Sequence, residues 1–305
     1  MRTFYLFLGV LLIGNLAWGQ ADRNRLNRGA GISEEVLAQY AAKEFEGLPY
    51  RLLLPDGYDK NTNYPLILSL HGRGGVGNDN ESQMRQWLET FVDPAWRAKF
   101  PCIVVAPQSE DSWMITREVP PEFTETELAK YSEDWRRRIR DRGFPSEAAA
   151  KGSLSLALNL LDQLAGLYAV DENRIYVLGH SMGGFGTWNA IWAAPDRFAA
   201  AIPSAGGLPP WKSYARFKDV PIWAFHGDAD PTVPVDYTRQ IFARMKEAGG
   251  NMKYSELPGV KHNASRWAFA LPGTENASGY PVACSSDRCD ETAGVWDWLF
   301  EQRLE

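Results

Sequence analysis

One serine of this chain lies in a sequence setting that favours nucleophilic chemistry. Ser181 is the centre of Gly-His-Ser-Met-Gly at 179–183, directly after the apolar run Ile175–Leu178 and directly before a helical pattern. A sharp turn from a strand into a helix forces the central residue into a cramped backbone conformation, so the residues two positions away on each side must be small. Gly179 and Gly183 meet this need. We therefore predict that Ser181 is a nucleophile.

A serine nucleophile needs a base. The free hydroxyl is weakly nucleophilic at neutral pH, so a histidine must take its proton while an acid orients that histidine. With this kind of turn, the order along the chain is serine, acid, histidine. We predict His262 as the base because it follows the run Lys253–Leu257 and a turn, on a loop at the carboxyl edge of the expected sheet. A surface histidine in a polar loop is the alternative.

The acid is expected in the loop after the apolar run Ile222–Phe225. This loop contains two carboxylates, Asp228 and Asp230. Asp230 is the predicted acid because Pro231 turns the chain immediately after it. We interpret His226, in the same loop, as a structural residue, with a catalytic role as the alternative.

Two backbone amides could form an oxyanion hole. The amide of Met182 opens the helix after the serine, where the helix dipole favours negative charge. A second donor is expected in the glycine-rich loop at 70–75, because glycine lets the backbone approach a substrate closely. The predicted donor is the amide of Arg73, with the glycine on either side as the alternative. His71 and His180 are interpreted as packing and hydrogen-bonding residues.

No cofactor or metal is expected. Residues 72–77 match the glycine spacing of a dinucleotide-binding turn, but the next apolar run ends at 106–109 without the acidic residue that would hold a ribose. The four histidines are scattered, and none has another histidine four positions away, as a helical zinc site needs.

Apolar runs alternate with longer helical patterns, which predicts an α/β fold with a mostly parallel central sheet flanked by helices. The candidate strands are Tyr50–Leu54, Leu66–Leu70, Ile103–Ala106, Ile175–Leu178, Ala199–Ile202, Ile222–Phe225 and Lys253–Leu257. Helices are expected at about 154–167, directly after Ser181, at 235–248 and at 291–304.

The N-terminus has the layout of a signal peptide. Arg2 precedes an apolar run at 4–13, and small residues at 17–19 precede a polar stretch. The run is shorter than the roughly 18 residues that a spanning helix needs, although a short membrane anchor is the alternative. We expect residues 1–19 to be removed, leaving a secreted or periplasmic catalytic domain at 20–305.

Charge and cysteine content constrain the partners and the covalent structure. The formal net charge of −6 argues against nucleic acid and anionic membranes as partners. In an oxidising compartment, Cys284 and Cys289 could close a small loop through a disulfide. Cys102 lies in an apolar segment and is interpreted as a buried, inert thiol.

Taken together, these motifs resemble those of bacterial exported esterases of the α/β-hydrolase superfamily. These include enzymes labelled predicted peptidases or prolyl-oligopeptidase-like hydrolases, and they are similar to polyhydroxybutyrate-depolymerase-like and feruloyl-esterase-like enzymes. The resemblance runs from about Leu48 to the C-terminus. It depends on segments 48–55, 64–72, 105–108, 171–185, 195–198, 219–227, 230–234 and 258–263.

The resemblance implies an α/β-hydrolase fold with Ser181, Asp230 and His262 as a catalytic triad. It also implies hydrolysis of small or polysaccharide-linked carboxylic esters, such as acetyl or feruloyl esters, through an acyl-enzyme. A serine peptidase with the same triad and a non-catalytic binding protein are the alternatives.

Two segments depart from the family pattern. Residues 268–290 add a loop, and the charged stretch 110–150 is enlarged. The second is interpreted either as a solvated helical excursion or as a lid or wall over the active site.

Overall fold

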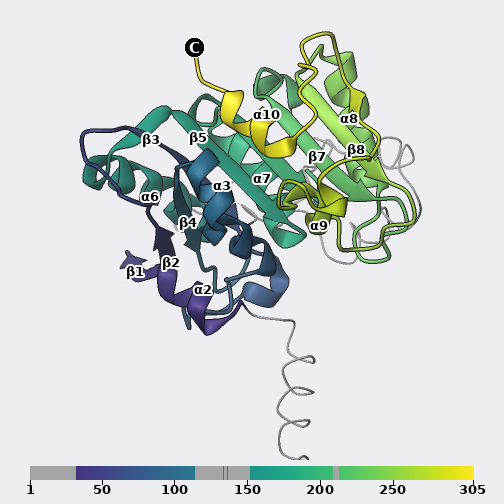
Figure 1. Ribbon diagram of the computed structural model, residues 1–305. Helices are drawn as coiled ribbons and strands as arrows, with labels where there is room; N and C mark the ends of the chain where they lie inside the picture. Colours follow the sequence, from purple (N-terminus) through teal and green to yellow (C-terminus); the bar gives the residue numbers. More distant parts are fainter. Residues whose placement is uncertain (1–31, 114–132, 134–135, 137–151, 209–212) are drawn as a thin grey trace, which may run out of the picture. The chain divides into compact units, whose positions relative to one another are not determined.

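The structure is a computed structural model that describes residues 32–113, 133, 136, 152–208 and 213–305 (Figure 1). The predicted signal peptide at 1–19 and most of the 110–150 excursion lie outside these residues. The description below therefore concerns the unit that begins at Ile32.

A nine-stranded sheet organises this unit, in the order β1-β2-β4-β3-β5-β6-β7-β8-β9. Its centre is parallel from β4 to β8, whereas β1, β2 and β9 pair antiparallel at the two ends. The strands are β1 (Ala41–Phe45), β2 (Leu48–Leu53), β3 (Tyr64–Leu70), β4 (Ile103–Pro107), β5 (Val170–His180), β6 (Ala200–Ser204), β7 (Ile222–Gly227), β8 (Met252–Leu257) and β9 (Ala283–Cys284).

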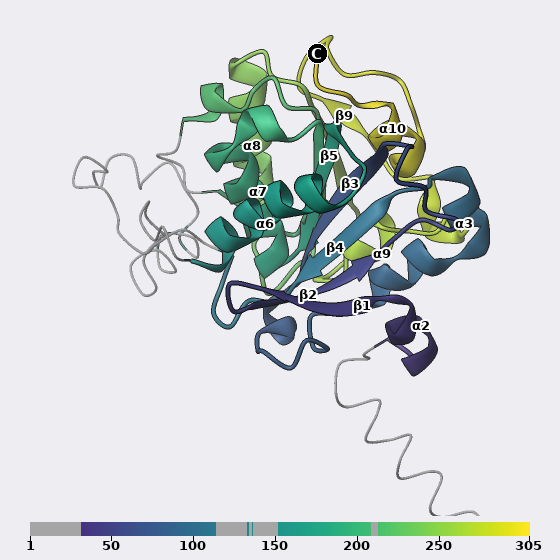
Figure 2. The ribbon, with the colours of Figure 1, turned by 90° about the vertical axis from the view of Figure 1, so that its left-hand side faces the viewer.

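Helices cover both faces of the sheet. Figure 2 shows α6, α7 and α8 on one face and α3, α9 and α10 on the other. The helices are α2 (Glu34–Gln39), α3 (Pro94–Lys99), α6 (Ser153–Leu167), α7 (Met182–Ala193), α8 (Asp236–Glu247), α9 (Ser265–Ala268) and α10 (Val295–Glu301). Because the strands from β4 to β8 are parallel, their carboxyl ends lie at the same edge of the sheet.

The central strands are apolar throughout because both of their faces are buried. Successive side chains of a strand point to opposite faces. Leu66 and Leu68 of β3 accordingly join the cluster under α6, α7 and α8, while Ile67 joins the cluster under α3, α9 and α10. The sheet thus separates two hydrophobic cores.

The predicted fold class is confirmed, and a strand forms at each of the seven predicted runs. β5 is longer than predicted, and the last helix is shorter, at Val295–Glu301. The sequence patterns did not reveal β1 or β9. Their residues carry little apolar signal, and their pairing depends on the neighbouring strands β2 and β8.

The added segment at 268–290 is more than a loop, since it contributes β9 to the sheet edge. The amide of Ser285 donates to the carbonyl of Met252 at 2.9 Å. Lys253, which is 3% exposed, pairs with Asp290 at 2.8 Å. These contacts fix the segment against β8.

The cysteines fall into two environments. Cys102 is 4% exposed, and burial raises the pKa of its thiol. Cys284 and Cys289 are free thiols in hydrogen-bonding contact; burial and Cys289 raise the pKa of Cys284 to about 11. The disulfide between these two residues stays a prediction.

Each helix that the structure describes is too short or too polar to cross a membrane.

Two leucines of α6 provide a matched test of the core. Leu164 is 0% exposed, whereas Leu167, one turn later, is 63% exposed. Leu164→Ala should lower the free energy of unfolding by about 2 to 5 kcal/mol through lost burial and a cavity. Leu167→Ala should change it by at most about 0.5 kcal/mol. Urea unfolding followed by circular dichroism measures both, and equal losses would contradict this packing.

Candidate active site

The turn between β5 and α7 forces Ser181 into a strained conformation, with φ 59° and ψ −119°. A Cβ atom on Gly179 would lie 2.5 Å from the carbonyl oxygen of Gly183, and one on Gly183 would collide with the carbonyl of Leu70. Both positions must therefore be glycine. A left-handed conformation at a non-glycine residue costs energy and persists where the surrounding structure holds it.

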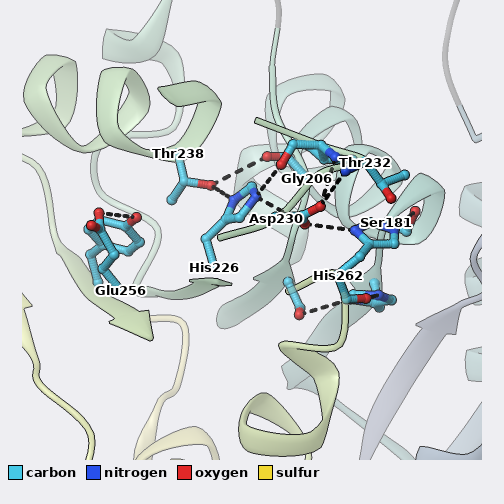
Figure 3. A network of polar contacts seen from close by, with 12 residues as sticks. Ser181, Gly206, His226, Asp230, Thr232, Thr238, Glu256 and His262 are labelled. Atoms are coloured by element: carbon cyan, nitrogen blue, oxygen red, sulfur yellow. Dashed lines mark hydrogen bonds and ion pairs between the residues drawn. The ribbon is translucent and has the colours of Figure 1, made fainter. Parts of the chain in front are cut away.

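Ser181, His262 and Asp230 form one hydrogen-bonded row (Figure 3). Ser181 Oγ lies 2.8 Å from His262 Nε2, and His262 Nδ1 lies 2.7 Å from Asp230 Oδ2. Because a carboxylate accepts, Nδ1 carries the proton, which leaves Nε2 free to accept from the serine hydroxyl. The structure thus brings together the three residues that the sequence proposed for the triad.

Asp230 is fully buried at its side chain and held from both sides. Its Oδ1 accepts from the amides of Thr232 at 2.7 Å and Val233 at 2.9 Å. Burial acts to raise the pKa of Asp230, but these bonds and those from His226 and His262 outweigh it and hold the pKa well below the usual range. The carboxylate is therefore ionised and can accept from His262 Nδ1.

The loops that carry Asp230 and His262 are tied directly to each other. The amide of Ala229 donates to the carbonyl of Val260 at 3.1 Å. Asp228, the other carboxylate of its loop, accepts from the amide of Gly259 at 2.6 Å. A Cβ atom on Gly227 would collide with the Val260 carbonyl, so this glycine permits the approach. Asp228 thus anchors the base loop, a role that the sequence did not reveal.

His226 supports Asp230 from the side opposite His262 (Figure 3). Its Nε2 lies 2.9 Å from the carbonyl of Val233 and 3.5 Å from Asp230 Oδ2. Both are acceptors, so Nε2 carries a proton. Nδ1 lies 2.7 Å from Thr238 Oγ1, and this hydroxyl also lies 3.4 Å from the carbonyl oxygen of Gly206. His226 is a buried neighbour of the acid rather than the partner of Ser181.

His180 ties the loop of His262 to the turn at Ser181. Its Nε2 donates to the carbonyl of His262 at 3.0 Å, and its Nδ1 accepts from the hydroxyl of Ser204 at 3.0 Å. Burial, followed by repulsion from His262, lowers the pKa of His180 to about 3. The ring therefore stays neutral and keeps one donor and one acceptor.

The glycine-rich loop lies beside Ser181, as expected for an oxyanion loop. The Cβ position of Gly72 is 3.6 Å from Ser181 Cβ. Within the described part of the chain, neither the amide of Arg73 nor that of Met182 donates to a protein acceptor. The two amides predicted for the oxyanion hole are therefore unengaged.

His71, with the amide of Ser109 and the side chain of Gln108, holds this loop in place. The amide of Ser109 donates to His71 Nε2 at 2.9 Å, and His71 Nδ1 donates to the carbonyl of Gly72 at 2.7 Å. Burial lowers the pKa of His71 to about 4. Gln108 Nε2 donates to the carbonyl of Gly75 at 3.1 Å. Gln108 and Ser109 follow the carboxyl end of β4, the one sequence signal that could have identified them.

The described residues contain no group of three or more histidine, cysteine or acidic side chains that could hold a metal ion. Their chemistry is that of a hydroxyl, an imidazole, a carboxylate and backbone amides.

The sheet order and the sharp turn at Ser181 after a central strand define an α/β-hydrolase fold. The chain belongs to the family described as "Putative esterase", whose sequence model matches residues 48–274.

Individual relatives agree with this family. The crystal structure of a thermostable esterase is 31% identical, with a TM-score of 0.64, and the match covers 88% of this chain and 64% of that one. "Putative esterase NocK" of Nocardia uniformis subsp. tsuyamanensis is 33% identical over 202 residues, 66% of this chain and 48% of that protein. An "Uncharacterized secreted protein" of Arthroderma benhamiae is 25% identical over 233 residues, 67% of this chain and 22% of that protein. The chain spans less than half the length of both curated relatives.

The buried neutral histidines make stability depend on pH. In the unfolded chain a histidine takes up a proton below about pH 6.5, whereas folded His71 and His180 resist protonation down to pKa values of about 4 and about 3. Stability is therefore complete above pH 6.5 and falls as the pH decreases from there, by at most about 1.4 kcal/mol per pH unit for each histidine. Urea midpoints between pH 7.5 and 4.5 measure this slope.

Glutamine does not titrate, so His180→Gln should reduce the dependence of the unfolding free energy on pH. The reduction should be at most about 1.4 kcal/mol per pH unit, the contribution of one proton. An unchanged slope in both His180→Gln and His71→Gln would contradict the neutral assignment.

Proposed function

We propose that this protein is a serine hydrolase that cleaves carboxylic esters through an acyl-enzyme. Ser181 is the nucleophile, His262 the general base and acid, and Asp230 the group that orients the base. The observation that carries the proposal is the 2.8 Å and 2.7 Å row from Ser181 through His262 to Asp230. Membership of an esterase family supports the choice of an ester as substrate.

Acylation begins when Ser181 Oγ attacks the ester carbonyl carbon and its proton passes to His262 Nε2. Asp230 stabilises the resulting imidazolium, and the amides of Met182 and Arg73 donate to the oxyanion. The intermediate collapses as the carbon–oxygen bond to the alcohol breaks and His262 returns its proton to the leaving oxygen. Water then repeats the sequence on the acyl-enzyme, which releases the acid and restores Ser181.

The substrate class is proposed to be small or polysaccharide-linked esters, including acetyl and feruloyl esters. The peptidase alternative uses the same triad but must also protonate an amine leaving group. A panel of acetylated and feruloylated sugars, short-chain model esters and peptide amides distinguishes these substrates. Faster turnover of peptide amides than of all esters would favour the peptidase.

Secretion or export to the periplasm is part of the proposal. It is supported by the leader-like pattern at 1–19, and one relative carries the word "secreted" in its name. The disulfide between Cys284 and Cys289 would form in such a compartment. Thiol titration of the exported protein under denaturing conditions tests the disulfide.

Replacing the nucleophile is the direct test of the mechanism. Ser181→Ala should lower kcat for p-nitrophenyl acetate by about four to six orders of magnitude, as removal of a triad serine does. An unchanged circular dichroism spectrum would show that the variant is folded. Turnover like that of the wild type would mean that another group attacks the ester.

The proposed role of His262 as base predicts how kcat/KM changes with pH. Protonated His262 cannot accept the serine proton, so kcat/KM for p-nitrophenyl acetate should decrease as the solution is acidified from pH 8 to 5. His262→Gln should abolish this dependence along with most of the rate. A flat wild-type profile, after correction for unfolding, would remove His262 from the base role.

A further inference from the structure

A half-buried guanidinium lies against the oxyanion loop. Arg85 packs on Gly74, so closely that a Cβ atom there would collide with its Nη2 and would lie 3.2 Å from its Cζ. Gly74 has no left-handed backbone conformation that would itself require glycine. A side chain at position 74 would therefore displace the end of the Arg85 side chain.

The segment around Arg85 is fixed beside the nucleophile. Trp87, two residues later, donates from Nε1 to the hydroxyl of Ser69 at 3.0 Å and packs edge-on against His180. His180 in turn precedes Ser181 and bonds the base loop. Arg85 thus belongs to a segment that packs next to the turn at Ser181.

The charge of Arg85 has no partner among the residues that the structure describes. No hydrogen bond or ion pair joins its guanidinium to them, and burial alone accounts for the lowering of its pKa. His71 lies close enough for the guanidinium to help lower the pKa of this neutral ring. Arg73, whose side chain is exposed on the same loop, is likewise without an ion pair there.

Partly burying a guanidinium costs solvation energy, which an anion can offset. The planar fork of arginine matches a carboxylate in a bidentate manner. A free carboxylate on an ester held at Ser181 would meet the guanidinium of Arg85 beside the oxyanion loop.

We propose that Arg85 forms an anion subsite and that the protein prefers esters bearing a carboxylate close to the scissile bond. This inference rests on the proposed ester hydrolysis and specifies its substrate class. The anionic group can belong to the acyl part or to the alcohol part of the ester, and the experiment separates the two.

The experiment compares charged and neutral esters of matched size. The acyl pair is p-nitrophenyl hemisuccinate and p-nitrophenyl levulinate, and the alcohol pair is 4-acetoxybenzoate and its methyl ester. The ratio of kcat/KM, charged over neutral, is measured at low and high salt. In Arg85→Gln the ratio should fall by about tenfold or more for at least one pair. This is about the fold-change in binding that one hydrogen bond to a charged group contributes.

Three further variants sharpen the result. Arg85→Lys should keep part of the preference, because it retains the charge but loses the fork. Gly74→Ala keeps the arginine but displaces it, so its ratio should fall like that of Arg85→Gln. Arg244→Gln, which removes an exposed arginine on α8, is the matched control and should leave the ratio unchanged. Added salt should reduce the preference in the wild type more than in Arg85→Gln.

Equal ratios in the wild type and Arg85→Gln for both pairs would overturn the subsite. Equal slowing of charged and neutral esters in Arg85→Gln would also overturn it, since the guanidinium would then support the loop rather than bind substrate. Failure of the wild type on all four esters would reject the proposed function, whereas hydrolysis of neutral esters without charge preference would reject only the subsite.

Discussion

The close approach of backbone at the end of β5 is the constraint on which the site depends. The carbonyl of Leu70, at the end of β3, lies where a side chain on Gly183 would have to be. On the other side, the amide of Ser181 donates to the carbonyl of Ser204, at the end of β6, at 2.9 Å. Three adjacent strands therefore meet at Ser181. The strained conformation of Ser181 is held by the sheet itself, and the oxyanion loop that continues from β3 arrives next to it.

Buried histidines connect this fixed point to the loops. His71 holds the glycine-rich loop, His180 the loop of His262 and His226 the loop of Asp230. In His71 and His180, one ring nitrogen donates and the other accepts. A protonated ring would have two donors, so one bond of each pair would be lost. This division of roles is consistent with the proposal that His262 is the histidine that transfers protons, while the other rings are buried beside it.

The predictable features of this protein are those that stereochemistry fixes locally. The turn around Ser181 requires small neighbours, and the order of serine, acid and base leaves few choices, so the row could be proposed from the sequence. The supports depend on partners distant in the chain. Asp228 bonds Gly259, Gln108 bonds Gly75, and Thr238 bonds His226, and none of these pairs has a spacing that a motif could reveal. The same reason hid β1 and β9, whose pairing comes from neighbouring strands.

The ends of the sheet have a consequence for association between molecules. β1 forms one edge, and its burial pattern exposes Ala41 to Glu44, including two opposite charges at Lys43 and Glu44. β9 forms the other edge with only two residues. Short or charged edge strands discourage the addition of a strand from another chain. The apolar strands at the centre are thus enclosed between margins that oppose sheet extension, which protects the folded protein against fibril-like growth.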